Sequence, residues 1–186
     1  ISVGNVSVSI TGPSTVCTGN QINLTASGAT SYTWDTGAQV STIAPSPTVT
    51  TTYSVIGVSG NCSNTAVRTI TVNPFPVLTV SGNSVICAGQ TSTLTVSGAS
   101  TYSWSTSSTA TAINVSPATN TVYSVDGNSL GCITNATFAV TSNSLPIVTV
   151  AQSATAVCVS SPVSFTASGA NTYSWSGGPS TNTFVT

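Results

Sequence analysis

Charge is the scarcest property of this chain. Its 186 residues include one basic residue, Arg68, two acidic residues, Asp35 and Asp126, and no histidine or methionine. A general acid or base must carry a titratable group close to a substrate proton, and a nucleophilic hydroxyl needs a base beside it. The many Ser and Thr hydroxyls of this sequence have no His or Lys to activate them. The composition therefore indicates a protein that is not an enzyme and has no catalytic residues.

The same scarcity argues against nucleic acid, metal ions and cofactors as partners. A net charge of -1 offers no cluster of Lys and Arg to neutralise phosphates. Calcium sites need several carboxylates together, and Asp35 aligns with Ser105 and Ser176 in the repeats described below, so an acidic residue does not recur there. Asp35, followed by Thr36 and Gly37, is better read as a solvated turn residue than as an ion ligand. We expect no cofactor and no metal site.

Long apolar runs are also missing. No run approaches the ~20 residues that cross a bilayer, so this segment has no predicted membrane span. No charged region followed by an apolar stretch begins at Ile1, so an export signal would lie outside the segment. The chain is nevertheless 39% hydrophobic, with Val, Ile and Leu at alternating positions, which indicates a folded protein and not a disordered linker.

What the chain does contain is a long internal repeat. Cysteines and tryptophans recur at steps of 70 and 71 residues, which is the size of a domain, so the chain reads as a tandem array. Prolines at Asn73-Pro74-Phe75-Pro76 and at Ser144-Leu145-Pro146 mark stiff junctions and predict a semi-rigid rod. We predict four segments: 1–5 as the end of a preceding repeat or a linker, 6–73 as repeat 1, 74–143 as repeat 2, and 144–186 as a truncated repeat 3.

Strand signals dominate each repeat. Thr, Val, Ile and Tyr alternate with period two, clusters of Gly, Pro, Asn and Ser interrupt them, and no segment has a helical pattern. Each repeat is predicted to form a small β-sandwich of six or seven short antiparallel strands, with a first strand from Val6 to Val16 that kinks at Gly12-Pro13. Tyr32 and Trp34 could form a sugar-stacking platform, but aromatic pairs in such strands more often lie in the core. The predicted core aromatics are Trp34, Tyr53, Trp104, Tyr123 and Trp175.

Five cysteines occupy two recurring places. The spacing of 45 residues within each full repeat suggests the disulfides Cys17–Cys62 and Cys87–Cys132, with the partner of Cys158 beyond the end of the chain. Such a bond would contribute roughly 4 kcal/mol to a small domain and implies an oxidising, extracellular setting. Free buried thiols are the alternative. Zinc fits less well because neither a C-x-x-C pair nor a histidine accompanies the cysteines.

The recurring motifs resemble a known class of repeats. A C-x-G motif, then S-G-A-x-x-Y-x-W, then T-x-Y-S-V, then a Cys before the last strand, is similar to immunoglobulin-like and PKD-like repeats of large secreted surface proteins of Bacteroidota. The resemblance covers Cys17 to Val72, Cys87 to Thr141 and Cys158 to Thr186, although Val159-Ser160-Ser161-Pro162 departs from it. It implies an all-β fold of tandem immunoglobulin-like sandwiches of about 70 residues each in a rod-like array.

In a strict seven-strand immunoglobulin layout, the first and last loops lie at opposite ends. The pairings Cys17–Cys62 and Cys87–Cys132 therefore require a shortened strand order or a displaced first strand. The resemblance also implies export by a type IX system.

The leading functional hypothesis is a structural repeat region that forms the shaft of an extracellular filament or cell-surface adhesin. One alternative is a module that binds glycans or a cell surface, and another is a spacer beside a secreted hydrolase. Because only 2% of residues are charged, few charges protect the edges of the sheets, which predicts self-association of edge strands into a filament or fibre. If Thr186 were the true terminus, strands from another copy would complete the third repeat.

Overall fold

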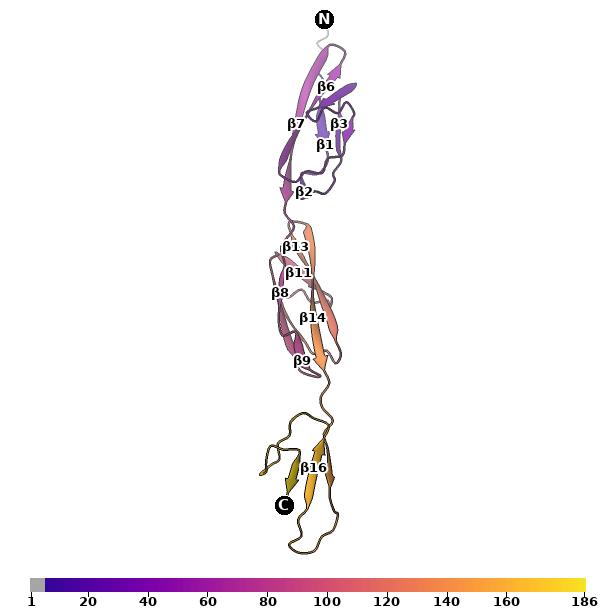
Figure 1. The fold of residues 1–186 in the computed structure, drawn as a ribbon. Helices are drawn as coiled ribbons and strands as arrows, with labels where there is room; N and C mark the ends of the chain where they lie inside the picture. The colour runs from indigo at the N-terminus through magenta and orange to yellow at the C-terminus, as the bar shows by residue number, and fades with distance from the viewer. Residues whose placement is uncertain (1–5) are drawn as a thin grey trace.

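The computed structural model describes residues 6–186, so the predicted role of residues 1–5 lies outside the described part. The described chain forms 17 β-strands and no helix, which confirms the all-β prediction. The strands make five sheets. Figure 1 shows these sheets gathered into three units that follow one another along a line, which is the rod-like arrangement predicted from the repeats.

The first unit contains two facing sheets. One sheet has the strand order β1-β3-β5 and the other the order β2-β7-β6-β4. The two longest strands, β6 and β7, form a hairpin that runs the length of the unit. The bounds are β1 Ser9–Thr11, β2 Thr15–Cys17, β3 Leu24–Ser27, β4 Ser31–Trp34, β5 Thr42–Ile43, β6 Thr51–Ser59 and β7 Cys62–Asn73.

The kinked first strand divides between the two sheets. Its first part, β1, pairs antiparallel with β3, and its second part, β2, pairs parallel with β7 through the partners Cys17 and Asn73. The break follows Gly12, whose φ of 147° suits glycine and where a Cβ would lie 2.7 Å from a methyl carbon of Leu24. The expectation of purely antiparallel strands was therefore wrong at β2. A divided first strand across two sheets in this order is an immunoglobulin-like sandwich.

The second unit repeats this plan strand for strand. Its sheets have the orders β12-β10-β8 and β11-β13-β14-β9, and β9 is again parallel to β14. The bounds are β8 Thr79–Ser81, β9 Val85–Cys87, β10 Ser92–Ser97, β11 Thr101–Trp104, β12 Ala112–Val115, β13 Thr121–Ser129 and β14 Cys132–Asn143.

Each complete unit has its own core. In the strand β3 of the first unit, Leu24 and Ala26 alternate with more exposed threonine and serine, as the period of a strand requires. Leu24, Trp34 and Val55 are buried together in one cluster, and the second unit has a separate cluster built on the equivalent positions. Two separate cores, and not one merged core, account for the tandem arrangement.

The third unit contains three strands in one sheet. The strands β15 Thr149–Gln152, β16 Ser164–Ser168 and β17 Thr183–Val185 are ordered β15-β16-β17. They correspond to the three-stranded sheet of each complete unit. The predicted boundaries at 73/74 and 143/144 fall between β7 and β8 and between β14 and β15, and they stay predictions.

Candidate functional site

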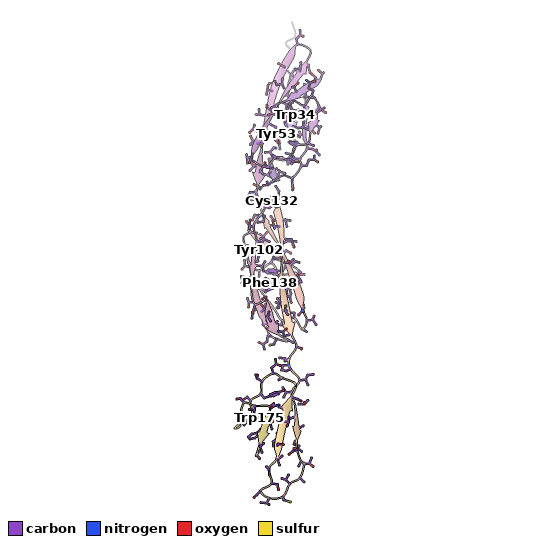
Figure 2. The ribbon with its side chains drawn as sticks, in the orientation of Figure 1. Trp34, Tyr53, Tyr102, Cys132, Phe138 and Trp175 are labelled. Atoms are coloured by element: carbon purple, nitrogen blue, oxygen red, sulfur yellow. A yellow bond between two sulfur atoms is a disulfide. The ribbon has the colours of Figure 1, made fainter. Side chains whose placement is uncertain are left out.

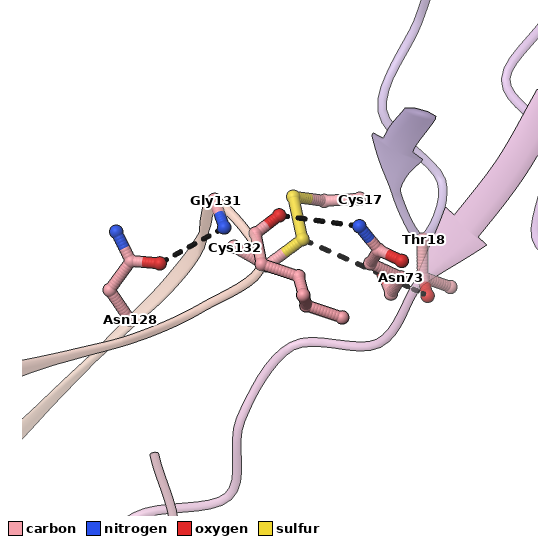
Figure 3. The surroundings of a disulfide bond; sticks show 7 residues. Cys17, Thr18, Asn73, Asn128, Gly131 and Cys132 are labelled. Carbon is pink, nitrogen blue, oxygen red and sulfur yellow. Dashed lines mark hydrogen bonds between the residues drawn. A yellow bond between two sulfur atoms is a disulfide. The ribbon is translucent and has the colours of Figure 1, made fainter. Parts of the chain in front are cut away.

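The most informative site is the joint between the first and second units. Its centre is a disulfide between Cys17 and Cys132, whose Cα atoms are 5.6 Å apart and which are 115 residues apart in the sequence. Cys17 is the last residue of β2, and Cys132 is the first residue of β14. Figure 3 shows the sulfur bridge passing from the end of one unit to the tip of the β13–β14 hairpin of the next.

This bond corrects the predicted pairings Cys17–Cys62 and Cys87–Cys132. Cys62 and Cys87 are free thiols in the structure. The reason is the direction of the strands: β7 begins at Cys62 and ends at Asn73, which is the partner of Cys17 in the parallel ladder. The eleven steps from Cys62 to Asn73, at ~3.3 Å each, separate the two cysteines by about 36 Å, whereas bonded cysteines have Cα atoms within roughly 7 Å. The two cysteines of one unit therefore lie at its opposite ends.

Asn73 organises the polar contacts of the joint. Its carbonyl oxygen accepts hydrogen bonds from the backbone nitrogen of Thr18, at 3.0 Å, and from the Thr18 hydroxyl, at 3.2 Å. Its side-chain amide donates to the carbonyl oxygen of Leu130, at 3.2 Å, across the joint. The Cys132 sulfur lies 3.7 Å from the Asn73 carbonyl oxygen. Asn73 therefore links β2, β7 and the hairpin of the second unit.

The hairpin turn is also shaped for this contact. The side chain of Asn128 accepts a hydrogen bond from the backbone nitrogen of Gly131, at 3.0 Å, and Leu130 and Gly131 both have positive φ angles. This tight turn places Cys132 at the tip of the hairpin, where it is 1% exposed. The disulfide is thus shielded by the two units that it joins.

The linker between the two units is held against the second unit. Leu78 packs against the core of that unit, and Pro76 is buried. Gly98, in the S-G-A motif, has a φ of 105°, and a Cβ there would lie 1.9 Å from the carbonyl oxygen of Val77. Only glycine lets the linker pass this close. The recurring glycine of the motif therefore serves the junction as well as the turn.

The predicted core aromatics have different environments. Trp34, Tyr53 and Trp104 are buried, whereas Tyr123 and Trp175 are half-buried. Figure 2 shows Trp34 and Tyr53 inside the first unit and Trp175 in the third. The indole nitrogens of Trp34 and Trp104 donate to carbonyl oxygens of the following turn, both at 2.9 Å. These rings face inward, which does not suit them to stack on sugars.

The tyrosine of the S-G-A-x-x-Y-x-W motif braces the turn that precedes it. The hydroxyl of Tyr32 donates to the carbonyl oxygen of Ala29, at 2.8 Å, and accepts from its backbone nitrogen, at 2.9 Å. Tyr102 makes the same two bonds with Ala99. The spacing A-x-x-Y in the S-G-A-x-x-Y-x-W motif carried this signal. Sequence reasoning also missed Asn73 and Leu130 at the joint, because the spacing of the repeat does not show which residues of neighbouring units touch.

The three charged residues make local contacts. Arg68 donates to the carbonyl oxygens of Gly12 and Pro13 and so fastens the break in the first strand to β7. The Asp35 carboxylate accepts from the backbone nitrogen of Ser54, at 2.8 Å, and the Asp126 carboxylate accepts from the side chain of Asn135, at 2.7 Å. Within residues 6–186 there is no group of three or more His, Cys, Asp or Glu that could hold a metal ion.

Burial, and to a smaller extent the Asp35 carboxylate, raises the pKa of the Tyr53 hydroxyl above its ordinary value of 10.0. Both causes favour the neutral phenol, since an ionised ring would lie away from water and near a negative charge. Tyr53 therefore acts as a neutral core side chain over the ordinary pH range.

No helix among the described residues is long and apolar enough to cross a membrane. No protein-family model matches the chain, and no characterised protein matches it in sequence.

Several solved structures are similar to this chain. An amphioxus IgVJ-C2 molecule is 12% identical, with 68% of this chain and 99% of that chain covered and a TM-score of 0.34. The N-terminal eight Ig domains of Down Syndrome Cell Adhesion Molecule are 13% identical, with 79% and 28% covered and a TM-score of 0.30. The titin domains z1z2, solved in complex with telethonin, are 12% identical, with 76% and 100% covered and a TM-score of 0.28.

Scores this low carry no argument about function, so the immunoglobulin-like assignment depends on strand order. Each complete unit has a three-stranded and a four-stranded sheet and a first strand divided between them. An immunoglobulin-like fold with a disulfide is consistent with an extracellular or cell-surface protein.

Proposed function

We propose that this chain is a structural repeat region that forms the shaft of an extracellular filament or cell-surface adhesin. The observation that carries the proposal is the disulfide Cys17–Cys132, which joins two successive units and not two strands of one unit. A bond inside one unit would stabilise that unit alone. A bond between units stiffens the array, which is useful in a protein whose task is mechanical.

The strand order gives tension a direct route along the rod. The last strand of the second unit, β14, begins at Cys132 and ends at Asn143, so it spans the unit from one joint to the next. The same strand pairs parallel with β9 through Asn143 and Cys87. A pull along the rod acts parallel to these strands, so the ladder hydrogen bonds are loaded together in shear and not opened one by one. This arrangement favours resistance to extension.

The surface also fits a shaft more closely than it fits a ligand site. It is neutral and rich in hydroxyl groups, and its three charged side chains are engaged by neighbouring groups. Large apolar side chains nevertheless remain exposed on the hairpins, at Val67, Val122 and Ile133. These positions and the free edges of the sheets are where we propose that shafts associate laterally. The resemblance to Bacteroidota surface repeats supports export by a type IX system as part of this proposal.

Immunogold electron microscopy of intact source cells tests the proposal. Antibodies raised against the folded 186-residue chain should label extended surface structures along their length. Labelling that appears only after lysis would overturn an extracellular role. A glycan array probed with the same oxidised chain should give no specific signal, and saturable binding to one glycan class would favour the adhesion module. Labelling that surrounds a secreted hydrolase on the cell surface would favour the spacer.

A further inference from the structure

Each complete unit carries two half-joints, one at each end. The upper half-joint is the hairpin tip, with a cysteine as the first residue of the last strand: Cys62 in the first unit and Cys132 in the second. The lower half-joint is the end of the parallel pair, with Cys17 beside Asn73 and Cys87 beside Asn143. The disulfide Cys17–Cys132 joins one lower half to one upper half. The other two half-joints, at Cys62 and Cys87, have free thiols.

The free lower half-joint has the same backbone geometry as the bonded one. The backbone nitrogen of Ala88 donates to the carbonyl oxygen of Asn143, at 2.8 Å, just as Thr18 donates to Asn73, at 3.0 Å. Both cysteines occupy the same register against the last strand. Cys87 is thus already held in the position from which Cys17 forms its bond.

Burial distinguishes the two lower half-joints. Asn73 is 8% exposed beneath the hairpin of the second unit, whereas its equivalent Asn143 is exposed. Cys17 is half-buried and Cys87 is exposed. Asn143 and Cys87 hold the same register positions as Asn73 and Cys17, and at the bonded joint the Asn73 amide donates to Leu130, two residues before Cys132. A hairpin tip with a carbonyl group two residues before a cysteine would make the same contacts at Asn143 and Cys87.

We propose that Cys87 forms a disulfide with the hairpin-tip cysteine of the unit that begins at residue 144 of the same polypeptide, so that disulfides join successive units and none closes within a unit. The linker from 143 to 148 leads from the Cys87 end of the second unit directly into this next unit (Figure 1), as 73 to 78 does at the bonded joint. Cys62 is the corresponding upper half, available to a unit on its N-terminal side. This disulfide pairing does not rest on the proposed shaft function.

Forming each bond is a two-electron oxidation. One cysteine thiolate attacks the disulfide of a thiol oxidant, such as a dithiol oxidase of the oxidising compartment, and forms a mixed disulfide. The second cysteine thiolate then attacks the protein sulfur of that mixed disulfide, which releases the oxidant as a dithiol. The two protein thiols lose two electrons and two protons, and the oxidant gains both.

Disulfide mapping of the natural full-length protein tests this pairing. Free thiols are alkylated, and the unreduced protein is digested with chymotrypsin, because a chain with one basic residue gives almost no tryptic peptides. Aromatic or leucine residues separate all five cysteines, so each lies on its own peptide. We expect the Cys17 peptide linked to the Cys132 peptide, and the Cys87 peptide linked to a hairpin-tip peptide of the third unit. Alkylated Cys87, or Cys87 linked to Cys132, would overturn the proposal.

Two matched variants separate this proposal from misfolding. In the full-length chain, Cys87→Ser should leave one new alkylated cysteine, in the hairpin of the third unit, with the Cys17–Cys132 bond intact. Cys17→Ser, as the control, should free Cys132 alone. A disulfide-linked oligomer on a non-reducing gel, lost in Cys87→Ser, would show instead that the hairpin comes from a second molecule and would overturn the same-chain form. None of these results depends on the immunogold labelling. The proposed pairing can therefore be wrong while the proposed shaft function is right, and the reverse.

Discussion

The second and third units share a local motif but differ in their cores. The motif S-G-A-x-x-Y-x-W gives the same hydrogen bonds in both: Trp104 donates to Ala110 at 2.9 Å, and Trp175 donates to Thr181 at 2.8 Å. The hydroxyls of Tyr102 and Tyr173 likewise each accept a backbone N–H, at 2.9 Å. These contacts are therefore fixed within a few residues of sequence.

The burial of the tryptophan side chain, in contrast, depends on the long hairpin formed by β13 and β14. Trp104 is 3% exposed because β13 and β14 cover it, whereas Trp175 is half-buried and borders a hollow of about 220 Å³. Residues 172–175 do not form a strand, since the described chain has no counterpart of β13 beside them. The motif therefore shapes the turn, and the hairpin builds the core.

The largest expected effect comes from removing the disulfide between units. Cys17→Ser should lower the combined free energy of unfolding of the first two units by about 4 to 5 kcal/mol, because the bond closes a loop of 115 residues. Guanidinium unfolding of the 186-residue chain measures this loss. Cys158→Ser, which alters an exposed free cysteine, is the control and should change little.

A thiol count of the same chain gives an independent check. Under denaturing conditions, we expect three reactive thiols, at Cys62, Cys87 and Cys158. Bonds within each repeat would leave Cys158 as the single reactive thiol, and that result would contradict the joint described here.

Trp104→Ala and Trp175→Ala form a matched pair for the core. Trp104→Ala should destabilise the second unit by about 3 to 5 kcal/mol, since it empties a buried site. In the same 186-residue chain, Trp175→Ala should cost much less, because its ring is already partly exposed. Hydrogen exchange of backbone amides in β13 and β14 measures the first loss locally. Equal losses in the two variants would contradict the role given to the hairpin.

Gly98→Ala tests the close passage of the linker. The change adds a Cβ at a φ of 105° and within 1.9 Å of the Val77 carbonyl oxygen, so we expect a loss of roughly 2 to 4 kcal/mol. Gly89→Ala is the control, because it has a φ of 83° but no heavy atom within 4 Å of the added Cβ. Its cost should be about 1 to 2 kcal/mol. Urea unfolding compares them, and similar losses would show that backbone conformation alone matters.

The smallest expected effect is a pH dependence confined to the first unit. Because the pKa of Tyr53 is raised in the folded state, its contribution to stability is complete below pH 10 and is lost as the pH rises through the folded pKa. Unfolding in urea between about pH 8 and 11 should show this decline. Asp35→Asn should lower the folded pKa, since it removes the smaller cause of the shift. An unchanged alkaline profile in Tyr53→Phe would rule out this tyrosine as the source.

Sequence reasoning recovered the features that repeat. Equally spaced tryptophans and cysteines predicted the tandem units, and of the predicted core aromatics Trp34, Tyr53 and Trp104 are buried. The break after Gly12 was also predicted, although the parallel pairing of β2 with β7 was not. Parallel pairing joins segments far apart in sequence, so no local pattern reveals it.

The disulfide could not be derived from spacing, because two recurring cysteine positions allow bonds within one unit, 45 residues apart, as well as bonds between neighbours, 115 residues apart. Strand direction decides the matter: Cys62 begins β7, and Cys17 lies beside its end. The opposite positions of first and last loops in an immunoglobulin layout were the one signal that pointed to the observed pairing. The burial of Asn73 could not be predicted from spacing either, since it results from contact with another unit.

The joint has a consequence for the rotational phase of the rod. The main chain and the disulfide connect the same two units at two separate points, so neither unit can swivel about the linker while the other stays fixed. The second unit is therefore set at a defined angle to the first. If every joint carries such a bond, as we propose, a given face would recur along the rod with a constant pitch. Lateral packing of such rods would require matching pitches, which would allow copies of the same chain to recognise one another.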